Sequence, residues 1–279
     1  MSRRLASILL AALALAGCGG DTPEAPAPRA AATPAASPVP AAPPPHSAAA
    51  IAADLTATDA ALREAIAAWR RDGDPAHGDA PPEVAARAAR IERIHRALAA
   101  RRGRTSRTLA RLRGRVRSEA RDVIAARRAL DVLNAPRPGR EPPKVRRGPP
   151  EPADVLLGFY REARARSGVR VKLLAAVNLV ESDFGRVRNE SVSGAQGPMQ
   201  FMPATWRTYG RGGDVHDPHD AILGAARFLA AAGARGSEAG ALYRYNPSSL
   251  YVTAVSRYAR VMRRDLLAFY ALYASGAAR

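Results

Sequence analysis

The sequence predicts a mainly α-helical protein, and three observations support this fold class. Apolar residues return every three or four positions through most of the chain after residue 53, which is the spacing of one face of a helix. No segment alternates apolar and polar residues strongly enough to predict a strand. Two proline-rich stretches, residues 19–53 and 134–152, interrupt the pattern and separate two helical regions.

Residues 1–18 are typical of a targeting segment. Arg3 and Arg4 precede an apolar run that is too short to cross a bilayer. The run ends in Leu-Ala-Gly-Cys, which resembles a bacterial lipobox, so Cys18 would be the lipidated first residue of the mature chain. An ordinary signal peptide with an incidental cysteine is the alternative. Because Cys18 is the only cysteine, the chain cannot form an intramolecular disulfide.

The next two regions differ in their apolar content. Residues 19–53 are rich in proline and alanine and contain few large apolar side chains, so they predict an extended, disordered tether. Residues 54–133 predict three helices, at about 54–71, 83–101 and 105–133, with narrow apolar stripes built largely of alanine. A helical hairpin or a coiled-coil pair fits this pattern best.

The chain is strongly basic, with a formal net charge of +18 and a pI near 11.3. Eleven arginines and only two acidic residues lie between Arg101 and Arg128. Such a face suits an anionic membrane surface or anionic envelope polymers, although it could simply be a solvated face. No nucleic acid is expected, because the region follows an export signal and lacks interleaved aromatic residues.

Residues 134–152 hold seven prolines among basic residues and mark the clearest domain boundary. Residues 153–279 have the size of one domain. We expect this domain to fold and act without the helical region before it. Its helices are predicted near 153–167, 171–184, 203–209, 218–232, 238–245, 249–264 and 265–274.

Glu181 is the candidate general acid of this domain. It falls on the apolar face of the predicted helix 171–184, four residues after Val177, and Gly185 is placed to end the helix in the left-handed conformation. Desolvation and the negative end of the helix dipole both favour the protonated carboxyl group. A carboxyl that stays protonated near neutral pH can act as a general acid. A glutamate that reaches out to solvent is the alternative interpretation.

A small-residue loop and an aromatic segment follow the acid. The segment from Ser191 to Trp206 reads S-V-S-G-A-Q-G-P-M-Q-F-M-P-A-T-W and combines hydroxyls, an amide and aromatic rings. These are the groups that a sugar-binding cleft requires. A later Y-N-P-S-S-L-Y, residues 245–251, taken alone indicates only a turn between two helices.

The order and spacing of these motifs resemble those of SLT-type lytic transglycosylases, in the goose-lysozyme-like superfamily. The resemblance covers about Leu156–Met262 and implies a lysozyme-like, all-helical catalytic domain. It implies cleavage of the MurNAc–GlcNAc β-1,4 bond of peptidoglycan glycan strands, with formation of 1,6-anhydro-MurNAc and Glu181 as the only catalytic carboxylate. It also places Tyr245 and Asn246 beside Glu181, with Tyr251 lining the groove.

The expected substrate-binding residues fall into two chemical groups. Those that would hold acetamido and hydroxyl groups are Ser191, Ser193, Gln200 and Asn246. Those that would supply apolar faces are Phe201, Met202, Tyr245 and Tyr251. Asp183 is the nearest second carboxylate, but two residues from Glu181 on a helix it should point elsewhere.

No cofactor and no metal are expected. The sequence D-V-H-D-P-H-D, residues 214–220, could bind a metal, but Asp217 followed by Pro218 is typical of a helix N-terminus. The preceding G-R-G-G-D lacks the alternating carboxylates that a calcium loop needs.

Two other functions stay open at this point. A hydrolytic muramidase could use the same fold with a positioned water, and a wall-binding scaffold would have no activity. The targeting segment predicts a lipoprotein anchored in a membrane through Cys18, on the extracytoplasmic side, with peptidoglycan as its partner.

Overall fold

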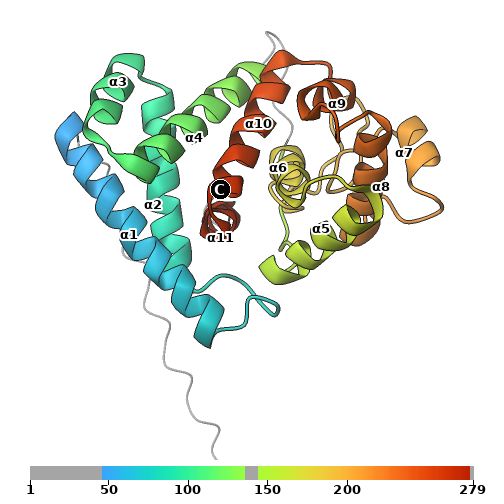
Figure 1. Cartoon of the computed structure of the whole chain (residues 1–279), viewed down its shortest axis with the longest axis horizontal. Coiled ribbons are helices and arrows are strands. Elements are labelled where there is room, and N and C mark those ends of the chain that lie inside the picture. Colours follow the sequence, from blue (N-terminus) through green and yellow to red (C-terminus); the bar gives the residue numbers. More distant parts are fainter. Residues whose placement is uncertain (1–45, 136–143, 277–279) are drawn as a thin grey trace, which may run out of the picture. The chain divides into compact units, whose positions relative to one another are not determined.

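We analysed a computed structural model that describes residues 46–135 and 144–276 (Figure 1). The predicted signal peptide with Cys18, most of the predicted tether and part of the predicted linker lie outside these residues. The described residues form eleven helices and no strands, with two isolated β-bridges, and this confirms the mainly α fold class. None of the described helices is long and apolar enough to cross a membrane.

Four helices precede the proline-rich linker: α1 (Ala48–Asp72), α2 (Pro82–Ala99), α3 (Arg102–Arg111) and α4 (Gly114–Leu133). Helix α1 begins at Ala48, with Ser47 as its N-cap, so residues 48–53 of the predicted tether are helical. The single helix predicted over 105–133 is wrong, because the chain breaks between α3 and α4. Leu112 is extended and almost completely buried there, and Gly114 adopts a positive φ of 49°.

Seven helices follow the linker, and their bounds agree closely with the predicted ones: α5 (Ala153–Ser167), α6 (Val171–Ser182), α7 (Pro203–Tyr209), α8 (Pro218–Ala231), α9 (Glu238–Tyr245), α10 (Ser249–Arg264) and α11 (Leu266–Ser275). Side chains that accept hydrogen bonds from the first turn explain several of the starts. Asp217 caps α8, Ser237 caps α9 and Ser248 caps α10.

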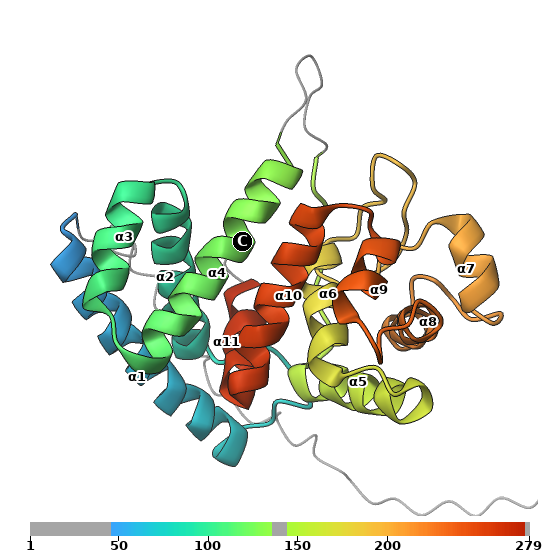
Figure 2. The same cartoon turned by 45° about the horizontal axis from the view of Figure 1, so that its top comes forward.

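Helices α10 and α11 lie between the N-terminal helices and α5–α9 (Figures 1 and 2). Helix α11 packs against α1 and α2. Helix α10 packs against α4 along one side and against α6, α9 and α11 along others. One apolar core runs from Leu62 and Trp69 on α1 to Leu174 on α6 and Phe269 on α11. A smaller cluster around Leu55, Leu98 and Leu112 joins α1 to α4. The two predicted helical regions therefore share a core.

This shared core weighs against the expectation that residues 153–279 fold on their own. Without the N-terminal helices, α10 and α11 would expose the faces that now cover the common core. The domain limits themselves stay predictions. The observed packing nevertheless makes α1–α4 a part of the body that supports the C-terminal region.

A buried carboxylate joins α4 to α10. Asp122 is 0% exposed and lies against three arginines of α10: Arg257 Nη1 at 2.6 Å, Arg264 Nη2 at 2.7 Å and Arg260 Nη1 at 3.7 Å. Burial alone would raise the pKa of Asp122, but hydrogen bonds from Arg257 and Arg264 outweigh it and hold this pKa below its ordinary value. The stabilisation from this cluster is therefore complete above the unfolded pKa near 4 and is lost as the pH falls through the folded value.

We expect Asp122→Asn to lower the free energy of unfolding by roughly 3 kcal/mol, because it leaves the buried ends of the arginines without their counter-charge. The partly exposed arginines keep the loss at the lower end of the range for broken buried pairs. Urea unfolding followed by circular dichroism would measure it. Asp72→Asn, at an exposed aspartate, is the matched control and should change the stability by less than about 0.5 kcal/mol. Equal stability of the two variants would contradict the role of Asp122.

Candidate active site

Helix α6 carries Glu181 in its last turn. The helix is apolar on nearly every side, and residues Leu173 to Leu179 are buried. The chain leaves the helix in the left-handed conformation at Asp183 (φ 55°), Phe184 (φ 61°) and Gly185 (φ 85°). The reversal thus begins two residues before the predicted Gly185. This reversal turns the chain away from the helix axis directly after Glu181. The Glu181 side chain therefore stays at the edge of the core and is partly buried.

The Glu181 carboxyl group accepts a hydrogen bond, at 2.6 Å, from the hydroxyl of Tyr251 in the first turn of α10. Burial raises the pKa of Glu181 to about 7, although the Tyr251 hydrogen bond acts in the opposite direction. Near neutral pH the group is therefore divided between its acid and base forms. A carboxyl group poised in this way can donate a proton and then accept one.

Aromatic rings support the acid from the side of α9 and α10. The Tyr245 ring lies parallel to the Tyr251 ring, with centroids 6.4 Å apart, and the Tyr245 hydroxyl donates to the Met199 carbonyl at 2.6 Å. Phe201 is 2% exposed and packs edge-on against Tyr245 and Trp206. Phe201 and the 1% exposed Tyr251 are thus packing residues, and neither presents a ring face as the sequence suggested.

The loop after α6 is braced by its own polar groups. The Ser191 hydroxyl accepts from the Ala195 amide at 2.9 Å and from the Ser193 amide at 3.3 Å. Gln200 has a positive φ of 50°, and its side-chain amide donates to the carbonyls of Gly197 (3.0 Å) and Asn189 (3.3 Å). A non-glycine residue in this conformation is strained, and such strain is commonly found at functional sites.

The other expected binding residues are more open. Ser193 and Met202 are exposed, the latter at 43%, and Asn246 is half-buried at the C-terminal end of α9. Among the described residues no direct hydrogen bond joins Glu181 to Ser191, Ser193, Gln200 or Asn246. The structure therefore brings Tyr251 into contact with the acid and keeps Tyr245 next to Tyr251, whereas these four polar residues are not among those that line the cleft around Glu181.

A buried polar network that the sequence analysis missed ties the loop to α6. Asn178 accepts from the Tyr160 hydroxyl (2.6 Å) and donates to the Pro198 carbonyl (2.9 Å). Ser182 donates to the same carbonyl at 2.6 Å. The signal was a polar residue, Asn178, in the middle of an otherwise apolar helix, which is costly unless its amide is bonded.

Glu181 lies in a cleft of about 390 Å³ between the end of α6 and the end of α4. Beside Glu181 the α6 side supplies Leu179, Val180, Ser182 and Asp183. Arg147, near the end of the proline-rich linker, donates to the Asp183 carboxylate at 2.5 Å. The second carboxylate that is nearest to Glu181 along the chain is therefore engaged by an arginine. The contribution of α4 to this cleft was not expected from the sequence.

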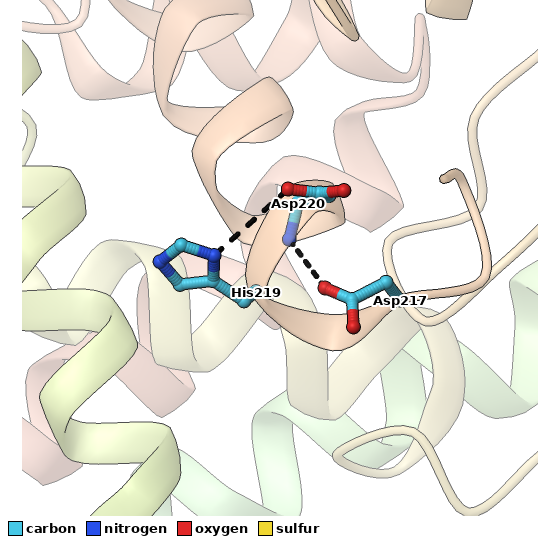
Figure 3. Close-up of side chains that lie close together, drawn as sticks. All are labelled: Asp217, His219 and Asp220. Atoms are coloured by element: carbon cyan, nitrogen blue, oxygen red, sulfur yellow. Dashed lines mark hydrogen bonds and ion pairs between the residues drawn. The ribbon is translucent and has the colours of Figure 1, made fainter. Parts of the chain in front are cut away.

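Asp217, His219 and Asp220 lie close enough together to hold a metal ion (Figure 3). Each has another role in this structure. Asp217 accepts from the Asp220 amide at 2.8 Å, and Asp220 accepts from the Asp214 amide at 3.0 Å. His219 Nε2 lies 2.8 Å from Glu162. The arrangement is the N-cap of α8 that the sequence predicted.

The comparison with known protein families gave one match. Residues 159–262 match the family model of the transglycosylase SLT domain. No curated protein and no solved structure matches the chain significantly. The matched segment contains Glu181, Gln200, Tyr245 and Tyr251, whereas α1–α4 lie before it. Residues 159–262 therefore match a transglycosylase SLT domain, which is consistent with a catalytic domain of the lytic-transglycosylase type.

Proposed function

We propose that the protein is a lytic transglycosylase, which cleaves the MurNAc–GlcNAc β-1,4 bond of peptidoglycan and leaves a 1,6-anhydro-MurNAc end. The SLT domain supports action on peptidoglycan. The observation that carries the finer proposal is Glu181 itself: a carboxyl group in a cleft, bonded to Tyr251, with a pKa of about 7.

The reaction needs one carboxyl group that works twice. Protonated Glu181 gives its proton to the glycosidic oxygen as the bond from this oxygen to C1 of MurNAc breaks. The Glu181 carboxylate then takes the proton of the MurNAc C6 hydroxyl while the C6 oxygen bonds to C1. The acid form is restored and no water is consumed. Glycosidases ordinarily use two carboxylates, but here Asp183, the nearest second one along the chain, is held by Arg147.

The surroundings of Glu181 suit a neutral sugar. Ser193 and Asn246 would bond hydroxyl and acetamido groups, as would the side-chain carbonyl of Gln200, whose amide is used in the loop. Met202 would cover an apolar sugar face. Ser191 would support the site by bracing the loop, and Phe201 by packing against the Tyr245 ring. Tyr251 would position the acid through its hydrogen bond to Glu181.

Glu181→Gln should nearly abolish cleavage, since the amide keeps the shape of the side chain but has no proton to transfer. General acid–base catalysis is typically worth about 10²–10⁴-fold in rate. Turnover of purified peptidoglycan by the mature chain would measure the loss. Glu64→Gln, at an exposed position on α1, is the control and should keep full activity. Full activity of Glu181→Gln would refute the assignment of the acid.

Mass spectrometry of the same digests separates the proposal from its rivals. Ring closure gives a non-reducing anhydro end, which is lighter by one water than the hydrolysis product. If only reducing MurNAc ends form, the protein is a muramidase. If the folded wild-type chain binds peptidoglycan but releases nothing, it is a wall-binding scaffold.

The rate should fall as the pH rises through about 7, because Glu181 is then deprotonated before it can act as the acid. Tyr251→Phe should move this fall to higher pH, since the lost hydrogen bond favoured the charged carboxylate. The dependence of kcat/KM on pH would show both effects. A profile that stays flat between pH 6 and 9, or a shift to lower pH in Tyr251→Phe, would contradict the proposed state of Glu181.

SLT-domain proteins act on cell-wall peptidoglycan, which indicates an extracytoplasmic location. We propose in addition that lipidated Cys18 anchors the chain and that residues 19–47 give it reach. Exposed arginines of α3, such as Arg102 and Arg107, would face anionic envelope polymers.

Cys18→Ser should move the protein from the membrane pellet to the soluble fraction, because it removes the acyl chains that hold it. Cell fractionation and mass spectrometry of the N-terminal peptide would check this. An unchanged pellet fraction, together with an unmodified N-terminal peptide in the unsubstituted protein, would rule out the anchor.

A further inference from the structure

One wall of the Glu181 cleft comes from outside the SLT domain. The last two turns of α4 supply Arg127, Leu130 and Asp131 to it, and the C-cap residue Asn134 completes this wall, which faces the end of α6. These residues lie in the part of the chain that the family model does not match. Their role therefore has to be judged from the structure itself.

Some polar side chains of the cleft already have hydrogen-bond or ion-pair partners within the protein, and others do not. Arg127 is paired with Glu92 of α2, and Arg147 with Asp183. The side chains of Asp131 and Asn134 are exposed, and neither makes a hydrogen bond or ion pair among the described residues. In the described part of the chain, the exposed free groups of this wall are therefore one carboxylate and one amide, while the unbonded Nε of Arg127 is buried.

Helix α4 holds these two groups in fixed positions. Asp122 binds it to α10, Arg127 binds it to α2, and Leu130 packs against the apolar core. Asp131 thus stands in the last turn of a supported helix, and Asn134 is its C-cap, with its backbone amide donating to the Leu130 carbonyl at 2.8 Å. A position supported in this way gives precise ligand contacts.

The remaining edge of the cleft is equally well fixed. Arg147 forms a β-bridge with Val187, and the Gly148 amide donates to the Arg186 carbonyl at 2.9 Å. The apolar side chains of Leu130, Val180 and Val187 line the cleft between its polar groups. An apolar surface with a few convergent polar groups is typical of small-molecule sites.

We propose that the end of α4 is a glycan-binding wall, in which Asp131 and Asn134 bond the hydroxyl and acetamido groups of the sugar next to Glu181. This inference rests on the proposed function and makes α1–α4 a part of the substrate site. A neutral sugar is favoured over an anionic peptide stem. The free carboxylate of Asp131 would repel an anion, and both arginines of the cleft already have carboxylate partners.

The test uses the mature chain with Asp131→Ala, Asn134→Ala and the double variant. Each lost hydrogen bond should raise KM roughly tenfold with little change in kcat, because the contact is made equally in the ground state and the transition state. Asp72→Ala, at an exposed aspartate of α1 outside the cleft, is the matched control and should leave KM unchanged. Circular dichroism would establish that all variants fold.

The outcomes distinguish this inference from the proposed function. An active wild type with unchanged KM in the double variant would overturn the glycan-binding wall alone. A loss of kcat in Asp131→Ala as large as that in Glu181→Gln would also overturn it, and would make Asp131 a second catalytic carboxylate. If the wild type cleaves nothing, calorimetry with a soluble peptidoglycan oligosaccharide still decides. Weaker binding by the double variant would support the wall, and equal binding would reject it.

Discussion

The contact between Asp122 and the arginines of α10 is the constraint on which the arrangement of the helices depends. A carboxylate that is completely buried would oppose folding if it had no partner. Arg257 and Arg264 approach it from one side, at 2.6 and 2.7 Å, and their own side chains remain partly exposed. Asp122 is therefore tolerated in the core only while α4 lies along α10. Apolar packing is non-directional, whereas this buried charge requires its guanidinium partners in place.

Helix α10 transmits this constraint to the site. Its first turn carries Tyr251, which bonds Glu181, and its last turns carry the arginines that bind Asp122. Helix α10 thus sets the position of Tyr251, the hydrogen-bond donor to Glu181, and also the position of α4. Since α4 ends at the cleft, the same contact also fixes the wall opposite α6. The helical region before the linker is then a structural part of the site, which an independent, surface-binding hairpin would not be.

Local signals in the sequence predicted the elements well and their long-range contacts poorly. Asp217 caps α8 as expected, and Ser237 and Ser248 cap α9 and α10 at the predicted starts of these helices, because a cap needs only its own first turn. Position on the apolar face likewise located Glu181. The break at Leu112 was missed because the apolar spacing continues across it. The partners of Asp122 are 135 or more positions away, so no local pattern reveals them. An aromatic residue gives no sign of which side it faces, and Phe201 and Tyr251 were therefore expected at the surface of the groove although both are buried.

Two acidic residues, Asp122 in the core and the partly buried Glu181 at its edge, show how desolvation leads to different protonation states. Desolvation opposes the charged form of both Asp122 and Glu181. At Asp122, guanidinium hydrogen bonds outweigh it, so the pKa is lowered and the ionised group stabilises the fold above pH 4 or so. At Glu181, a single phenol is too weak to do this, so the pKa rises to about 7. Deprotonation of Glu181 then costs stability as the pH rises from the unfolded value of about 4.3 through the folded one. Between pH values of about 4.3 and 7 the Asp122 cluster contributes its full stabilisation, whereas the ionisation of Glu181 lowers the free energy of unfolding. The Asp122–arginine cluster stabilises the fold, and the fold can therefore hold Glu181 in surroundings that disfavour its charged form.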